Sequence, residues 1–165
     1  MKVKAKYYKI FFIILVIIFI GLIGWLIYRQ VKEDLTQYDP KLQELKQIFT
    51  EFFSQDRYWS GELEMLNNRN FMKDIKLYRG DKSYTINKQK IYICMKDKTG
   101  NYYDDNMLIY VIAHELSHAL CDEVGHTQKF SRIFDTLLFE LEKAGIYDAD
   151  IPIINNYCED GDPEV

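Results

Sequence analysis

Three histidines and a glutamate within one stretch of 13 residues have the types and spacing of a metal-dependent hydrolytic site. His114, Glu115 and His118 form the pattern H-E-x-x-H inside an apolar, helix-like stretch. Residues four apart on a helix lie on one face, about 6 Å apart, so the two imidazoles can bind one Zn²⁺ ion. Glu115 lies beside the first ligand, where it can take a proton from a water molecule on the metal. The pattern therefore predicts Glu115 as a catalytic base.

A third zinc ligand is expected close to the motif, because catalytic zinc usually has three protein ligands and one open position. His126 is the last of the three histidines in the chain and directly follows Gly125, which lets the chain turn back toward the motif helix. We therefore predict that His114, His118 and His126 bind one zinc ion. Three nearby acidic residues remain alternatives for the third ligand: Glu123, Asp122 and Asp135.

The motif lies on a helix that we expect between residues 106 and 122 or 123, with Asp104 or Asp105 as its N-cap. The apolar stripe of this helix follows i, i+4 spacing and consists of Leu108, Ile112, Leu116 and Leu120. The stripe is offset from the histidines. The helix can therefore bury one side and present its ligands on another.

The other elements predict an α+β fold. Asp39 caps an expected helix over residues 40–54, whose apolar face should pack on the domain core. Thr127 caps a second amphipathic helix that runs to about residue 144, and a weak helical signal covers residues 62–67. Residues that favour β-structure predict three strands, near 75–78, 83–86 and 90–96. We expect a small antiparallel sheet packed on the motif helix.

Several residues near the motif could assist the reaction. The strand at residues 91–95 could be an edge strand that pairs with an extended peptide, or an ordinary core strand. Asp135 and Glu123 are candidates to accept hydrogen bonds from the zinc-binding imidazoles. Four tyrosines are candidate donors to an oxyanion, with no basis for choosing among them: Tyr102, Tyr103, Tyr110 and Tyr157.

The N-terminal part of the chain has the pattern of a membrane anchor. Residues 10–28 contain no charge and would form a helix about 28 Å long, enough to cross the hydrocarbon core of a bilayer. A cleaved signal peptide is the alternative, but it would have a shorter apolar core, and Gly24-Trp25-Leu26 is a poor cleavage site. We therefore predict a single-pass membrane protein.

The basic residues near the span favour a cytoplasmic N-terminus and a translocated C-terminal domain. Arg29 and Lys32 follow the span, and Lys41 and Lys46, a little further on, weaken the bias. The lysines that precede the span are Lys2, Lys4, Lys6 and Lys9.

Charge argues against nucleic acid as a general partner. Residues 1–29 hold five of the 21 Lys+Arg and no acidic residue, so the remainder has 16 basic against 25 acidic residues, a net charge of −9. A domain of this charge is poorly suited to binding phosphate backbones.

The three cysteines, Cys94, Cys121 and Cys158, are too few and too irregularly spaced for a disulfide framework. We expect free, mostly buried thiols. A single disulfide is the alternative if the domain is exported.

The zinc motif and its surroundings resemble the WLM and SprT-like zinc metallopeptidases. The pattern is H-E-x-x-H in residues 111–119, a short spacer, and then a His-containing turn before an aromatic residue that opens a helix, in residues 125–130. The resemblance extends to residues 83–88, to the strand ending at Cys94 and to Tyr157-Cys158, and it covers about residues 60–158. The chain is most similar to small WLM-like proteins of large DNA viruses.

This resemblance implies a zincin-like fold, with His114, His118 and His126 as zinc ligands and Glu115 as the base that assists peptide hydrolysis. Residue 124 is Val, so the spacing departs from the metzincin pattern H-E-x-x-H-x-x-G-x-x-H. Well-studied WLM and SprT relatives cleave proteins crosslinked to DNA. That activity is one alternative function, and a non-catalytic zinc-binding membrane or virion protein is another.

The expected organisation has four parts. Residues 1–30 form the anchor in a host or virion membrane, and residues 31–55 form a linker and the amphipathic helix. Residues 56–158 form the peptidase domain, and residues 159–165 an acidic tail.

Overall fold

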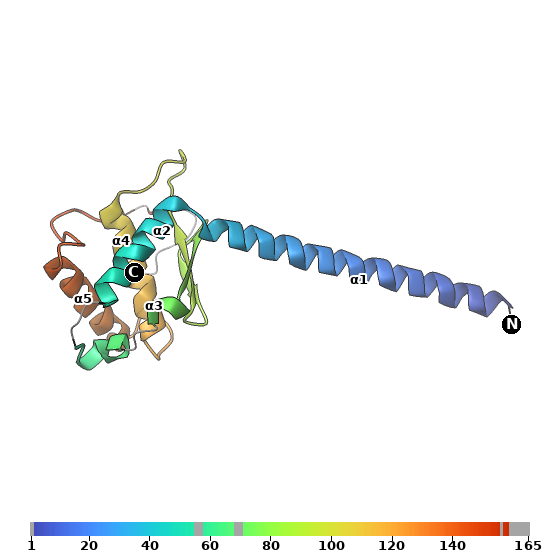
Figure 1. Cartoon of the computed structure of the whole chain (residues 1–165), viewed down its shortest axis with the longest axis horizontal. Coiled ribbons are helices and arrows are strands. Elements are labelled where there is room, and N and C mark those ends of the chain that lie inside the picture. Colours follow the sequence, from blue (N-terminus) through green and yellow to red (C-terminus); the bar gives the residue numbers. More distant parts are fainter. Residues whose placement is uncertain (1, 55–57, 68–70, 156, 159–165) are drawn as a thin grey trace. The chain divides into compact units, whose positions relative to one another are not determined.

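The computed structural model describes residues 2–54, 58–67, 71–155 and 157–158 (Figure 1). The chain forms two compact units, residues 1–36 and residues 37–165. The acidic tail expected at residues 159–165 lies outside the described residues.

Helix α1 (Lys2–Gln37) carries the apolar stretch, and its helical conformation continues through most of the expected polar linker. The side chains of residues 10–28 are exposed along this helix, apart from two glycines that have none. By length and composition, α1 could cross a membrane.

The second unit contains the remaining helices and strands. In chain order they are α2 (Pro40–Ser54), the 3₁₀ helix η1 (Gly61–Asn67), α3 (Phe71–Asp74), β1 (Lys76–Gly80), β2 (Tyr84–Ile86), β3 (Lys90–Cys94), α4 (Asp105–Leu120) and α5 (Gln128–Lys143). The three longer helices and the three strands confirm the prediction from sequence, and the weak helical signal at residues 62–67 is the 3₁₀ helix. The sequence did not indicate the single turn α3.

The sheet is mixed, so the expectation of an antiparallel sheet is wrong. Its strand order is β1-β3-β2, with β1 parallel and β2 antiparallel to the central β3. The chain must therefore cross the end of β3 between Gly80 and Tyr84. A Cβ on Gly80 would lie 2.7 Å from the carbonyl oxygen of Lys82 and 3.1 Å from Cβ of Tyr92, so this crossing requires a residue without a side chain.

Helix α4 lies between the sheet and α5, and it contacts both of them (Figure 1). Its apolar stripe, Leu108, Ile112, Leu116 and Leu120, is buried in the core as expected. The apolar face of α2 also joins this core, as the sequence predicted.

The buried carboxylate of Asp39 connects α2, β1 and the segment before α4. Its Oδ1 accepts hydrogen bonds from the backbone N–H groups of Lys41 and Leu42, at 3.1 and 3.3 Å, which caps α2. Its Oδ2 accepts from Nη1 of Arg79 at 3.2 Å and from the hydroxyl of Tyr102 at 3.0 Å. One side chain therefore satisfies donors from three parts of the fold.

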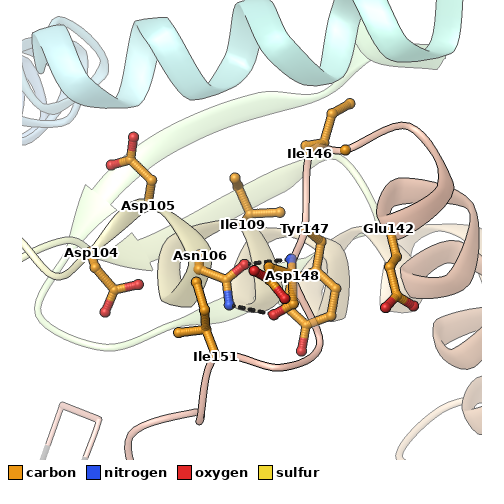
Figure 2. A pocket seen from close by; sticks show the side chains of 10 residues that line it. Asp104, Asp105, Asn106, Ile109, Glu142, Ile146, Tyr147, Asp148 and Ile151 are labelled. Atoms are coloured by element: carbon orange, nitrogen blue, oxygen red, sulfur yellow. Dashed lines mark hydrogen bonds between the residues drawn. The ribbon is translucent and has the colours of Figure 1, made fainter.

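A paired hydrogen bond fastens the start of α4 to the chain after α5 (Figure 2). Asn106 donates to the carbonyl of Asp148 at 3.0 Å and accepts from its N–H at 2.8 Å. The buried amide of Asn106 thus has partners on both sides.

A disulfide joins Cys94 at the end of β3 to Cys158, with Cα atoms 6.4 Å apart. The expectation of free thiols is therefore wrong for these two residues, and it is confirmed for Cys121, which is free and buried. The pairing arises because the C-terminal segment returns to the end of β3, where Tyr157 donates a 2.5 Å hydrogen bond to the carbonyl of Cys94.

Replacement of Asp39 by Ala is expected to lower the free energy of unfolding by about 2–4 kcal/mol, because it removes a helix cap and leaves four donors, most of them partly buried, without their charged acceptor. Asp104→Ala is the matched control, since Asp104 supplies one capping bond, to the N–H of Met107. This substitution should lower the free energy of unfolding by about 1 kcal/mol. Urea unfolding of the detergent-solubilised chain, followed by near-UV circular dichroism, measures both. An equal loss of unfolding free energy in the two variants would contradict the role of Asp39 in joining three parts of the fold.

Candidate metal centre

Helix α4 presents two histidines on one face. Asp104 caps the helix by accepting a hydrogen bond from the N–H of Met107 at 2.9 Å, which confirms one of the two expected caps. The ring centroids of His114 and His118, one turn apart, are separated by 5.0 Å. Both rings are half-buried.

The loop between α4 and α5 brings the third histidine back to this face. Cys121 adopts an extended conformation that ends α4, and Gly125 has a positive φ of 82° that suits glycine. Thr127 then caps α5 through a 3.3 Å hydrogen bond from the N–H of Phe130. His126 is thereby held between a glycine turn and a helix cap, as its place in the sequence predicts.

The Nε2 atoms of the three histidines converge. Nε2 of His126 lies 3.0 Å from Nε2 of His114 and 3.1 Å from Nε2 of His118. Tetrahedral zinc with nitrogen ligands at about 2.0–2.1 Å has nitrogen atoms about 3.3 Å apart, so the cluster has the size of a zinc site. A single ring nitrogen carries at most one proton and cannot donate to both neighbours. The three Nε2 atoms could instead hold one metal ion.

Burial keeps two of these imidazoles neutral. Together with the neighbouring imidazoles, burial lowers the pKa of His114 to about 3 and of His118 to about 4. Metal binding requires neutral imidazole. At neutral pH both rings are therefore in the form that binds metal.

Aromatic packing surrounds the imidazoles. The ring of Phe130 on α5 stacks on His118 at 4.2 Å and contacts His126 at 4.8 Å and His114 at 5.0 Å. Within the described hydrogen bonds, neither Asp135 nor Glu123 accepts from a histidine. Phe130 is therefore a ring neighbour that all three histidines share.

Glu115 is buried, with 5% of its surface exposed, rather than being a solvated helix carboxylate. Its Oε2 accepts a hydrogen bond from the hydroxyl of Thr85 on β2 at 2.7 Å. Burial raises the pKa of Glu115 to about 7, and the bond from Thr85 opposes that rise. A carboxyl poised near neutrality can both take up and release a proton. The sequence analysis missed Thr85, because only the position of β2 against α4 makes it a neighbour.

The histidines and Glu115 open into a cleft of about 1160 Å³. The cleft is lined by strand β2 and its flanking residues, by helix α4, by the loop of residues 123–126 and by residues 153–155 and 157–158. Ser83 fastens the C-terminal wall, because its hydroxyl lies 2.9 Å from that of Tyr157 and also accepts from the N–H of Cys94 at 3.0 Å.

The edge strand beside the site is β2, not the strand at residues 91–95. The latter is β3, the central strand, which pairs with a neighbour on each side. Its backbone hydrogen-bonds to β1 and to β2, so the alternative prediction, an ordinary core strand, is the correct one. Strand β2 pairs only with β3 in the described sheet, and its residues line the cleft.

The acidic residues considered as third ligands lie outside the histidine cluster. Of the alternative third ligands, Glu123 lines the cleft without joining the histidine cluster, and Asp122 forms an ion pair with Lys129 at 2.8 Å. Asp135 is exposed on α5.

Two of the four tyrosines considered as oxyanion donors, Tyr110 and Tyr157, line the cleft. The other two have other partners: Tyr102 donates to Asp39, and Tyr103 accepts from the N–H of Cys158.

A second cavity of about 610 Å³ lies at the start of α4 (Figure 2). Asp104, Asp105, Glu142 and Asp148 make its lining acidic, but its buried polar side chain, Asn106, is already paired with Asp148.

The chain is similar to three viral proteins. It is 50% identical over 119 residues to Uncharacterized protein 136R of Invertebrate iridescent virus 6, an alignment that covers 70% of this chain and 67% of the relative. It is 42% identical over 99 residues to Uncharacterized protein 042R of Invertebrate iridescent virus 3, covering 59% and 62%. It is 39% identical over 83 residues to Uncharacterized protein R325 of Acanthamoeba polyphaga mimivirus, covering 46% and 41%.

No protein-family model matches the sequence, and no solved structure matches it significantly. The chain spans about two thirds of the length of the iridescent virus relatives and less than half of the mimivirus protein.

The geometry predicts one zinc ion per chain, measured by plasma mass spectrometry after dialysis of the purified full chain. Replacement of His126 by Ala should weaken zinc binding by more than about 100-fold, because loss of an outer contact to a ligand already costs about 10–100-fold. Lys82→Ala, which changes an exposed residue lining the cleft, should leave zinc content unchanged. Full zinc occupancy in His126→Ala would remove His126 from the ligand set.

Proposed function

Because the chain belongs to the same family as protein 136R of Invertebrate iridescent virus 6, a family of viral proteins whose names state no activity, we propose its function from the site itself. The function is zinc-dependent hydrolysis of peptide bonds, with His114, His118 and His126 holding the metal and Glu115 acting as the base. The proposal includes the zincin-like, WLM/SprT-like character that the sequence motif suggests.

The observation that carries this proposal is the set of groups that share the cleft. Three imidazoles converge, and no fourth His, Cys, Asp or Glu joins their cluster among the residues with a described position. A structural zinc site is usually closed by four protein ligands, whereas a catalytic site keeps one position open. Glu115, buried beside the first ligand, supplies a carboxylate that a purely structural site does not need.

Zinc bound to these imidazoles would supply Lewis acidity that polarises a peptide carbonyl. Glu115 accepts a proton from the attacking water while the water oxygen bonds to the carbonyl carbon and the C=O π electrons move to the carbonyl oxygen. The C–N bond then breaks, and Glu115 returns the proton to the leaving nitrogen. The pKa of Glu115 near 7 suits both transfers.

We assign the peptide to the edge of β2. This strand has β3 on one side only, and it borders the cleft that contains the histidines and Glu115. An extended peptide can add to such an edge through backbone hydrogen bonds. Paired in this way, its scissile bond would lie along the cleft beside Glu115.

Charge makes proteins crosslinked to DNA a poor substrate class for this chain. Residues 30–165 carry 16 basic and 25 acidic residues, a net charge of −9. Binding to a phosphate backbone depends on basic residues that neutralise it. We therefore favour a peptide or protein substrate without nucleic acid.

We further propose that α1 anchors the chain in a host or virion membrane with its N-terminus in the cytoplasm and the catalytic unit on the other side. The lysine-rich N-terminus supports this orientation. The Cys94–Cys158 disulfide supports it independently, because disulfides persist in oxidising compartments and are rare in the cytosol.

Replacing Glu115 by Gln is expected to leave zinc content at one ion per chain and to lower kcat by at least about 100-fold, because general-base catalysis contributes about 10²–10⁴. The measurement is cleavage of a broad library of quenched fluorescent peptides by the full chain in detergent. Glu142→Gln, on α5 and outside the cleft, is the control and should cleave like the unaltered chain. Equal activity of Glu115→Gln and the unaltered chain would refute the mechanism. A zinc-loaded chain that cleaves no library peptide would refute the function.

Counting free thiols tests the proposed side of the membrane. The chain is denatured with maleimide and weighed by intact-mass spectrometry. Without reductant one cysteine, Cys121, should react, and three should react after reduction. Cys158→Ser should show two reactive cysteines under both conditions. Three reactive cysteines in the unreduced chain would argue against an oxidising compartment.

A further inference from the structure

Thr85 makes the only side-chain contact described for the carboxylate of Glu115. Its hydroxyl oxygen lies 2.7 Å from Oε2 of Glu115 and 3.0 Å from the carbonyl oxygen of the same residue. A hydroxyl has one proton and can donate to one acceptor at a time. The carboxyl oxygen is the closer of the two, and in the ionised form it is also the stronger acceptor.

The register of β2 brings Thr85 to this position. Thr85 pairs with Ile91 of β3, which is fully buried, so it lies on the face of the sheet that meets the core. Its neighbours Tyr84 and Ile86 point to the opposite face and are 44% and 40% exposed. A shift of one residue would put an aromatic or aliphatic side chain against Glu115. The contact therefore depends on one register of the edge strand.

The two carboxylate oxygens of Glu115 have different surroundings. Oε2 accepts from Thr85, whereas Oε1 has no hydrogen-bond donor among the residues that the structure describes. The side chain is buried and lines the cleft with all three histidines. One oxygen is held in place and the other remains available to accept a proton.

We propose that Thr85 is a positioning residue that holds the carboxylate of Glu115 in the orientation used for proton transfer and couples it to strand β2. The inference rests on the proposed peptidase function. It adds that the strand assigned to the peptide also orients the base, so one strand aligns both reacting partners.

The test compares Thr85→Val, which keeps the shape of the side chain and removes its hydroxyl, with Thr85→Ser, which retains the hydroxyl. Thr85→Val should lower kcat by about 10- to 100-fold, the effect of losing a hydrogen bond to a charged group, and leave KM nearly unchanged. Thr85→Ser should retain most of the kcat of the unaltered chain. Thr99→Val is the matched control, since it removes a 2.6 Å hydrogen bond to the carboxylate of Asp97 in an exposed turn. It should change neither constant.

A second readout does not depend on activity. The full chain is labelled with ¹³C at the glutamate carboxyl carbons and examined by NMR in detergent micelles. The resonance of Glu115 is identified by its loss in Glu115→Gln. Thr85→Val should shift this resonance, whereas Thr85→Ser and Thr99→Val should not. Zinc content should remain one ion per chain in all three variants.

The outcomes separate the two proposals. Suppose that the unaltered chain cleaves the peptide. An unchanged kcat in Thr85→Val, or a kcat in Thr85→Ser as low as in Thr85→Val, then overturns the role of Thr85 and leaves the function intact. If the zinc-loaded chain cleaves nothing, the function fails, and the positioning role that rests on it fails as well. The NMR shift then decides separately whether the contact exists. Loss of zinc in Thr85→Val assigns Thr85 a structural role and overturns the proposal.

Discussion

The packing of α4 on both of its sides is the constraint on which the site depends. One side buries the apolar stripe against the sheet, where each fully buried aliphatic side chain contributes about 1.5–3 kcal/mol. On the other side, Phe130 of α5 contacts the imidazoles. A rotation of α4 about its axis would expose the stripe and separate the rings from Phe130. The hydrophobic core therefore sets the direction in which the histidines point.

Burial also determines the electrostatics of the cleft. His114 and His118 remain neutral because the charged form is poorly solvated there, and Glu115 resists ionisation for the same reason. Three imidazole nitrogens and one carboxyl group form a set that could hold a divalent cation. The hydroxyl of Thr85 is the polar partner that makes the burial of Glu115 tolerable, because it satisfies one carboxylate oxygen.

The sheet and the disulfide build the cleft around this set. The crossing at Gly80 puts β2 on the free edge of the sheet, beside α4, and β1 on the opposite edge. The Cys94–Cys158 disulfide and the hydrogen bond from Tyr157 hold the C-terminal segment as the facing wall. Two segments far apart in the sequence are thus both fastened near the end of β3.

Local signals in the sequence determined much of the fold. Asp39 and Thr127 were recognisable as helix caps, and the cap of α4 was narrowed to Asp104 or Asp105, because such side chains bond to backbone N–H groups two or three residues away. The histidine pair followed from helical spacing within α4. The approach of His126 to this pair could be predicted because Gly125 allows a turn and the chain has only three histidines.

Only the tertiary structure decided the parallel pairing of β1 with β3, the disulfide, the central position of β3 and the contact between Thr85 and Glu115. Each of these joins residues 14 or more positions apart, whether in strand register, in the disulfide or across the site. Such pairs are selected by the burial of whole faces against one another, which the types and spacing of neighbouring residues do not encode. The sequence alone therefore determined which residues are candidates to bind a metal, and the packing of α4 against β2 determined that Thr85 contacts Glu115.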